Sequence, residues 1–325
     1  MIKIDLITGF LGAGKTTFIK KYASYLIDKG LNIGILENDH GAVNVDMLLL
    51  QELRGENCEL EMVAGACSDD CFKRRFKTRL ISMAMTGVYD RIIVEPSGVF
   101  DMDVFFDIVR EDPLDRWYEI GNVIAIADAT YIVKNVFSDL YKMNDKTSGM
   151  SDTDRYILAS EIANAGMIVV SKNDLQKADD TTLADAFDRL LNSIKCERKL
   201  NGHILSRNIS DYTNEDYELL LNCGYVRADY VKKSDIRSNY SSVYFLDETF
   251  DKSNLEKKIN QLFENTDCGE IFRVKGFFSL HGKWYLVNAT KDNYFTEEIK
   301  VGQEVFIVVG ENLNEEEIRN TLRDR

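Results

Sequence analysis

The sequence predicts an α/β protein: a doubly wound domain with a mostly parallel sheet, followed by a smaller α+β domain. Up to about Leu175, short β-branched runs alternate with longer helical stretches. Continuous apolar runs separated by helices are typical of a parallel sheet buried on both faces. Beyond about residue 240, strand patterns follow one another with amphipathic helices beside them. This second pattern is typical of an α+β domain.

The expected elements of the first domain follow from these patterns. Its five expected strand runs are residues 2–8, 31–38, 91–96, 122–129 and 166–174. The clearest helix pattern covers residues 18–30, and weaker ones cover 182–194 and 214–224. We expect this first domain to span residues 1–215.

A polar segment, VKKSDIRSNYSS, separates the two halves of the chain. We place a linker at residues 216–240 and the second domain at 241–325. The strands expected around and beyond this boundary are residues 242–250, 272–280, 283–292 and 304–311, and the helices are 254–265 and 314–325. A chain of 325 residues with 45% hydrophobic content is long enough to bury two cores.

Composition narrows the class of partner. The chain has 40 Lys and Arg against 54 Asp and Glu, a net charge of −14, which disfavours a nucleic-acid or anionic-membrane surface. The one basic run, residues 73–79, is interpreted as a solvated helix face. The sequence shows neither a signal-peptide pattern nor an apolar run near the ~18 residues of a membrane span, so we expect a soluble, cytoplasmic protein. The six cysteines are scattered, a pattern that predicts reduced thiols.

The strongest motif is G-F-L-G-A-G-K-T at residues 9–16, between an expected strand and an expected helix. This is the context of the phosphate-binding loop in P-loop NTPases. Lys15 is expected to reach the β- and γ-phosphates as a catalytic cation, and Thr16 to offer its hydroxyl to Mg²⁺. The alternative, a glycine-rich turn without ligand, does not require a lysine and a threonine in register. The residues expected to contact the nucleotide here are Gly12, Ala13, Gly14, Lys15, Thr16 and Thr17.

A second motif, V-E-P-S-G at residues 94–98, ends an expected buried strand. Ligands of doubly wound sheets bind at the carboxyl ends of the strands. Glu95 is therefore expected to hold a water on Mg²⁺ or to orient the attacking water, and Gly98 to bring its N–H to the γ-phosphate. The alternative is an acid that caps the following helix.

The motif that bears on which nucleotide base is bound is Ser171-Lys172-Asn173-Asp174. GTPases carry N-K-x-D at such a strand end, where the aspartate accepts from guanine and the lysine stem packs along the base. Adenine offers no such donor pair. Lys172 and Asp174 are in place, and Ser171 replaces the usual asparagine with a short donor or acceptor. We interpret the motif as a GTP site with a variant loop, against the alternative of a strand end with a capping aspartate.

Together these motifs resemble the CobW-like GTPases, which belong to the same broad P-loop class as the maturation GTPases for urease and hydrogenase. The residues that carry the resemblance are G-F-L-G-A-G-K-T-T, N-D-H-G with Asp46 downstream, E-P-S-G, K-N-D-L, and R-V-K-G-F in the second domain. The resemblance implies a P-loop GTPase domain followed by a CobW-type C-terminal domain. It also implies that GTP hydrolysis is coupled to delivery of a transition metal or to maturation of a metallocofactor, such as a cobalamin-related one.

The resemblance extends to two sets of metal ligands. The family's switch segment usually reads N-E-x-G, and here Asp39 stands in the acidic position, from which it could approach Mg²⁺ or a second metal. CobW-like proteins typically carry G-C-x-C-C after the switch, whereas this chain has Gly65-Ala66-Cys67-Ser68-Asp69-Asp70-Cys71. Cys67 and Cys71 are candidate ligands for Zn²⁺ or Co²⁺. The alternative, two buried or redox-active thiols, remains open.

The leading hypothesis is thus a Mg²⁺-dependent GTPase that binds GTP and GDP and acts on a client metalloprotein or cofactor-dependent enzyme. Its catalytic candidates are Lys15, Glu95 and Asp39, and a homodimer is left open. A second hypothesis is a GTPase switch or assembly factor that transfers no metal, motivated by the altered cysteine motif. A third, an ATP-dependent kinase or synthetase, would need an acceptor pocket, for which the sequence has no motif.

Overall fold

The computed structural model describes residues 1–39, 45–64, 69–96, 102–141, 150–233, 240–246, 254–291, 293–300 and 302–323. The chain divides into two compact units, one of Met1–Asp39 with Leu50–Arg237 and one of His40–Leu49 with Ser238–Arg325. The first unit thus continues well beyond residue 215. The second unit includes a stretch from the N-terminal half of the chain.

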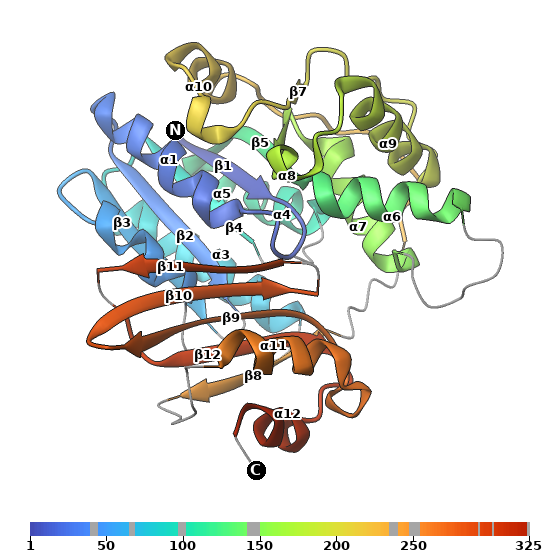
Figure 1. Ribbon diagram of the computed structural model, residues 1–325. Coiled ribbons are helices and arrows are strands. Elements are labelled where there is room, and N and C mark those ends of the chain that lie inside the picture. The colour runs from blue at the N-terminus through green and yellow to red at the C-terminus, as the bar shows by residue number, and fades with distance from the viewer. Residues whose placement is uncertain are drawn as a thin grey trace. The chain divides into compact units, whose positions relative to one another are not determined.

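A seven-stranded parallel sheet forms the centre of the first unit, with the order β3-β2-β4-β1-β5-β6-β7 (Figure 1). The predicted α/β class is confirmed. The five expected strands are all present, and β3 and β7 were not predicted. The strands are β1 (Ile2–Thr8), β2 (Ile33–Asp39), β3 (Cys58–Ala64), β4 (Arg91–Glu95), β5 (Tyr118–Asp128), β6 (Met167–Ser171) and β7 (Ile204–Leu205).

The helices of this unit follow from apolar residues at helical spacing and from capping residues. In the first helix, Phe18, Ile19, Tyr22 and Leu26 are buried, which makes one apolar stripe. The Thr213 hydroxyl caps a later helix in a reciprocal capping box, which fixes the start of that helix. The helices are α1 (Lys15–Asp28), α3 (Asp69–Thr86), α4 (Met102–Val109), α5 (Leu114–Trp117), α6 (Ala129–Tyr141), α7 (Asp152–Asn164), α8 (Asn173–Gln176), α9 (Asp180–Ser193) and α10 (Asn214–Leu221), while all but the last residue of α2 (Val45–Leu50) belongs to the second unit.

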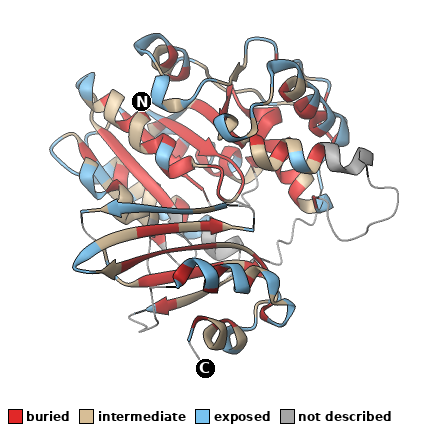
Figure 2. Ribbon diagram, in the orientation of Figure 1, coloured by how far each residue is buried: buried red, intermediate tan, exposed pale blue. Residues whose placement is uncertain are grey.

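The core of the first unit packs α1 and neighbouring helices against the sheet. Ile7, Ile93 and Ile126 from three strands contact the apolar stripe of α1 in one cluster. Leu220 of α10 belongs to the same cluster, so part of the expected linker is a packed helix. The strands in the middle of the sheet are almost entirely buried (Figure 2). This burial explains their continuous apolar sequences.

The second unit is a five-stranded antiparallel sheet with two helices, in the order β11-β10-β9-β12-β8. His281 and Gly282, both with positive φ, form the two-residue turn between β9 and β10. Such turns need left-handed backbone at both positions. The elements are β8 (Tyr240–Leu246), α11 (Leu255–Glu264), β9 (Glu270–Leu280), β10 (Lys283–Thr290), β11 (Asn293–Ile299), β12 (Val305–Glu311) and α12 (Glu315–Leu322).

The two faces of this sheet bury different partners. Phe306 and Val308 point to the face covered by α11 and α12, while Val305 and Ile307 point to the opposite face. This alternation is the period of a β-strand. On the opposite face the sheet packs against Leu48 and Leu49 of α2, which the contact pattern assigns to this unit. Short 3₁₀ turns lie at Gln51–Leu53, Ile209–Asp211 and Thr266–Cys268.

Two features of the described residues bear on the expected environment. None of the described helices combines the length and the apolar character that crossing a membrane requires. In the basic run on α3, Lys73, Arg74 and Arg75 are exposed, as expected of a solvated helix face.

Candidate functional site: a phosphate loop at the carboxyl end of the parallel sheet

The phosphate loop joins the end of β1 to the start of α1, as its motif predicted. Gly9 has φ 146° and Gly14, the N-cap of α1, has φ 97°; L side chains rarely adopt either conformation. A Cβ on Gly9 would lie 2.4 Å from the carbonyl oxygen of Ile126. The loop can therefore take this path only with glycine at its start, and it ends at a helix N-terminus, where anions bind.

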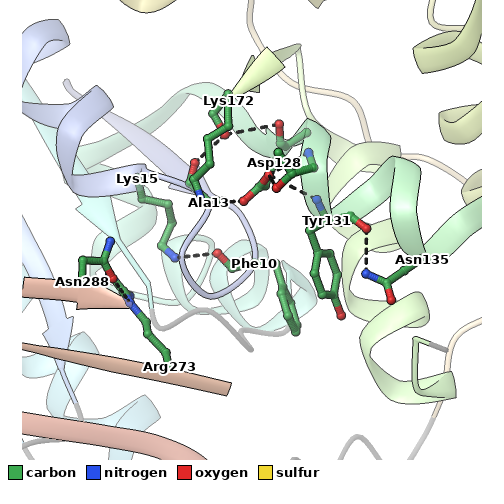
Figure 3. Close-up of polar contacts among 12 residues, drawn as sticks. Phe10, Ala13, Lys15, Asp128, Tyr131, Asn135, Lys172, Arg273 and Asn288 are labelled. Atoms are coloured by element: carbon green, nitrogen blue, oxygen red, sulfur yellow. Dashed lines mark hydrogen bonds and ion pairs between the residues drawn. The ribbon is translucent and has the colours of Figure 1, made fainter. Parts of the chain in front are cut away.

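Lys15 is the first residue of α1 and its side chain folds back across the loop. Its Nζ donates to the carbonyl oxygen of Gly9 at 2.8 Å and to that of Phe10 at 3.5 Å (Figure 3). Lys15 is only 8% exposed. The ammonium group is therefore already desolvated and held over the loop, where a bound phosphate would meet it.

Thr16 and Glu95, both of which the sequence analysis expected near Mg²⁺, lie next to each other. The Thr16 hydroxyl donates to Oε1 of Glu95 at 3.0 Å, and both residues are buried. Glu37, at the corresponding position of β2, pairs with Glu95 in the sheet register and is also buried. Thr17 is exposed. We call residues 9–16 with Glu37 and Glu95 the phosphate end of the site.

Glu37 was missed by the sequence analysis. The available signal was positional, because the residue stands near the end of a buried parallel strand just as Glu95 does. Buried acids are rare unless they are paired or bind metals. Two of them side by side at the carboxyl edge of the sheet mark this edge as a candidate cation site.

The loop at residues 171–174 lies beside the phosphate loop. The Ser171 hydroxyl donates to the carbonyl oxygen of Ala13 at 2.6 Å, so serine connects this loop to the phosphate loop. Lys172 has φ 56°, an uncommon conformation for a lysine, and its Nζ donates to Oδ2 of Asp128 at 2.5 Å (Figure 3). Asp174 is exposed in the first turn of α8. We call residues 171–174 with Asp128 the base end of the site.

Asp128, also missed by the sequence analysis, organises the base end. Its Oδ1 accepts from the backbone N–H of Thr130 at 2.9 Å and from the Thr130 hydroxyl at 2.6 Å, so it caps α6 while its other oxygen pairs with Lys172. The rings of Phe10 and Tyr131 stack with centroids 5.0 Å apart, and burial raises the pKa of Tyr131. These contacts join α6, the phosphate loop and the base end.

Beneath the phosphate loop lies the buried carboxylate of Glu161 on α7. Its Oε1 accepts from the Thr8 hydroxyl at 2.7 Å. Burial raises the pKa of Glu161 to about 7, while hydrogen bonds from Thr8 and the Gly9 N–H and the charge of Lys15 act in the opposite direction.

Comparison with known proteins identifies the family. Residues 3–201 match the nucleotide-binding domain of CobW/HypB/UreG proteins, and residues 240–325 match the C-terminal domain of the cobalamin synthesis protein cobW. The chain belongs to the CobW/HypB/UreG family. The resemblance drawn from its motifs is confirmed, and the family's nucleotide-binding domain contains both ends of the site.

Several named proteins are similar to this CobW/HypB/UreG chain. The zinc chaperone YeiR of Escherichia coli K12 is 25% identical over 174 residues, which cover 54% of this chain and 47% of YeiR. The zinc chaperone CobW of Pseudomonas aeruginosa PAO1 is 22% identical over 357 aligned positions, covering 99% of this chain and 91% of that protein. The chain thus spans about half the length of the first of these and most of the second. The Zn(II)-bound YjiA GTPase of E. coli has a TM-score of 0.39 at 19% identity, with 99% of each chain covered.

Some of the residues predicted from the CobW-like motifs lie outside the described part of the chain. Gly98 and Cys67 are among the residues that are not described, and the side chains of Asp39 and Cys71 are likewise outside it. Asp46 is described: it lies in the first turn of α2 and forms an ion pair with Lys275 of β9. Among the described residues, no group of three or more His, Cys, Asp or Glu is suited to hold a metal ion.

The four cysteines outside the C-S-D-D-C segment are buried or partly buried. Cys58, Cys196 and Cys268 are buried and Cys223 is partly buried, all as free thiols. Burial raises the pKa of Cys58 to about 11 and that of Cys223 to about 12. Such thiols stay protonated at neutral pH and are poor metal ligands and nucleophiles.

Proposed function

We propose that this chain binds and hydrolyses GTP in the cytoplasm, and that its nucleotide state controls the delivery of a transition metal or the maturation of a metallocofactor on a client protein. The observation that carries the nucleotide part is the phosphate end. There a buried lysine crosses a glycine loop and the Thr16 hydroxyl meets Glu95 at the carboxyl edge of a parallel sheet. Doubly wound sheets bind their ligands at this edge.

The donor set at the phosphate end fits Mg²⁺. Thr16 and Glu95 offer oxygen atoms, and Mg²⁺ binds through one or two such groups together with waters and substrate phosphates. Thr16 and Glu95 would hold Mg²⁺ next to bound GTP, where it would offset the charge that develops on the phosphates. Lys15 supplies a second positive charge, the N–H groups of residues 12–17 cradle the phosphates, and Gly98 approaches the γ-phosphate. Glu95 and Asp39 orient the attacking water.

Base selection is assigned to the base end. Asp174 accepts from the N1–H and 2-amino groups of guanine, and the Lys172 stem packs along the base. The ion pair between Lys172 and Asp128 holds that stem in place. Ser171 takes over the connection to the phosphate loop through its bond to Ala13, so replacing asparagine with serine is compatible with guanine binding.

The transferred metal is the cargo of this reaction, and Zn²⁺ or Co²⁺ is proposed. Four similar proteins are named zinc chaperones. Ala64, the last residue of β3, pairs with Asp39, the last residue of β2. β3 therefore ends at the carboxyl edge of the sheet, and Cys67 follows Ala64 by three positions in the sequence. Thiolates from Cys67 and Cys71 with a carboxylate from this edge are a donor set that suits Zn²⁺.

Chain continuity offers a route from the nucleotide to the second unit. The segment that follows Asp39 leads into α2, whose Asp46 is paired with Lys275 and whose Leu48 and Leu49 pack on the C-terminal sheet. A conformational change in the switch segment on GTP hydrolysis would alter the contacts of α2 with the C-terminal sheet. We propose that the C-terminal sheet reports the nucleotide state to the client.

The competing function is a GTPase assembly factor that transfers no metal. The spacing C-S-D-D-C in place of G-C-x-C-C favours it. Metal-stimulated GTP turnover that is lost when Cys67→Ser is combined with Cys71→Ser would exclude it.

The test of the nucleotide function is turnover of GTP and ATP with Mg²⁺, in the wild type and in Thr16→Ala. We expect slow GTP turnover of about 10⁻⁴–10⁻² s⁻¹, as in unstimulated GTPases, little ATP turnover, and loss of GTP turnover in the variant. Thr86→Ala is the matched control, because its hydroxyl bonds to Ser82 within α3. Equal use of ATP and GTP would contradict the proposed function.

A further inference from the structure

Glu161 holds the two residues at which β1 turns into the phosphate loop. Its carboxylate accepts from the Thr8 hydroxyl at 2.7 Å and from the Gly9 N–H. Residues 156–164 of α7 are all buried, so the carboxylate stands on a helix packed on every side. Glu161 therefore fixes the start of the loop from below.

Both backbone polar groups of Gly9, its N–H and its carbonyl, form hydrogen bonds. Its N–H faces Glu161, and its carbonyl oxygen accepts from Lys15 Nζ at 2.8 Å. Its Cα packs against the Ile126 carbonyl so closely that a Cβ would not fit. The buried Glu161 carboxyl group and the buried Lys15 ammonium group thus both bond to the backbone of Gly9, one at its N–H and the other at its carbonyl oxygen.

Burying the carboxylate form of Glu161 costs free energy, because an ionised group loses hydration that a few hydrogen bonds do not fully replace. A glutamine could hold Thr8 and Gly9 at no such cost, since its carbonyl oxygen also accepts. Holding the loop in shape therefore does not by itself explain an acid here. What an acid adds is a charge that can change.

We propose that Glu161 is a positioning residue of the nucleotide site that takes up a proton when the nucleotide binds. The inference rests on the proposed nucleotide function of the phosphate loop. Without nucleotide, an ionised Glu161 would offset the charge of Lys15. Bound phosphates bring negative charge to the same loop and draw Lys15 toward themselves, and both changes disfavour a second anion beneath it.

The balance of charges around Glu161 supports this direction. Lys15 of α1 is the charged side chain that acts on it, and the Thr8 hydroxyl of β1 and the Gly9 N–H are its polar neighbours. Helices α4 and α9 and strand β5 also pack against α7, but among the described residues none of their charged groups acts on Glu161. The pKa of about 7 means that any further rise falls in the neutral range.

The sign of the pH effect follows from linkage. Because binding raises the pKa of Glu161, the nucleotide binds the protonated form more tightly, so affinity falls as pH rises through 7. A rise of one pKa unit weakens GDP binding about fourfold between pH 7 and 8.5 and gives uptake of about half a proton at pH 7.5. The terminal phosphate, with a pKa of about 6, is already mostly ionised in this range.

The experiment is calorimetric titration of GDP into the full-length protein at pH 7, 7.5 and 8.5, in two buffers of different ionisation enthalpy. We expect proton uptake and the fourfold loss of affinity in the wild type, and neither in Glu161→Gln, which should bind GDP at pH 8.5 at least as tightly as the wild type does. Ser160→Ala, a buried neighbour on α7 that bonds to Ile157, should keep the wild-type pH slope.

Each outcome of this titration either supports or overturns the proposed role of Glu161. Equal pH slopes in the wild type and Glu161→Gln, with GDP bound by both, would overturn the role of Glu161 and leave the nucleotide function standing. No GDP binding by the folded wild type at any pH would overturn both. If Glu161→Gln does not fold, the wild type still tests the inference, because binding without proton uptake at pH 7.5 would contradict it.

Discussion

The two ends of the candidate nucleotide site are built in different ways. At the phosphate end, Lys15, Thr16 and Glu95 are buried and contact one another or the loop backbone. At the base end, the Lys172 side chain is 29% exposed and Asp174 is exposed. Buried charged contacts are stronger and less screened than exposed ones. If the proposed nucleotide function holds, we expect the phosphate end to supply most of the affinity and the base end most of the selectivity.

The largest effect should come from removing the buried cation of the phosphate end. Lys15→Ala is expected to weaken GDP and GTP binding by about 2–5 kcal/mol, the usual loss when one partner of a buried charge pair is truncated. Fluorescence titration with a labelled GDP measures it. Lys20→Ala, an exposed lysine of the same helix paired with Glu52, is the control and should bind normally. A Lys15→Ala affinity within threefold of the wild type would show that the phosphate end is not the main source of affinity.

A smaller and more selective effect is expected at the base end. Asp174→Asn should weaken GDP binding by about 1–3 kcal/mol, because hydrogen bonds to a charged acceptor are lost, while ADP binding stays unchanged. The ratio of the two dissociation constants is the measurement. Asp180→Asn, at the start of α9 with its side chain on Ser206, should leave the ratio as it is. If Asp174→Asn weakens GDP and ADP equally, Asp174 does not select the base.

The smallest effect concerns the connection between the two ends. Ser171→Ala removes the hydrogen bond to the Ala13 carbonyl and should cost about 1 kcal/mol of GDP affinity, as the loss of one neutral hydrogen bond does. Ser171→Asn, the residue usual in GTPases, should bind at least as well as the wild type. Unchanged affinity in Ser171→Ala would mean that the two ends act independently.

The sequence revealed the elements whose pattern is local. The buried stretches of β1, β2, β4, β5 and β6 are mostly apolar, although β1 also carries Lys3 and Asp5. β3 lies at the edge of the sheet. Its acidic residues Glu59 and Glu61 alternate with apolar ones, so its sequence is hard to distinguish from that of a loop. β7 has two residues and is too short to show any period.

The phosphate loop was readable because its glycines, lysine and threonine stand at fixed spacing. Glu161, by contrast, lies 153 positions from its partner Thr8, and Asp46 lies 229 positions from Lys275. Neither contact leaves a trace in local sequence, because the fold alone brings the partners together. The same holds for the burial of Glu37 beside Glu95, which depends on the strand order.

The central claim, that nucleotide state controls a metal site, is tested most directly by metal titration. Zn²⁺ and Co²⁺ are titrated into the reduced full-length protein loaded with GDP or with a non-hydrolysable GTP analogue, with Cys223→Ser as the control thiol variant. We expect metal affinities that differ about 5–150-fold between the two states, the usual range of coupling, and that disappear when Cys67→Ser is combined with Cys71→Ser. Metal binding that is absent, or identical in both nucleotide states, would contradict the account.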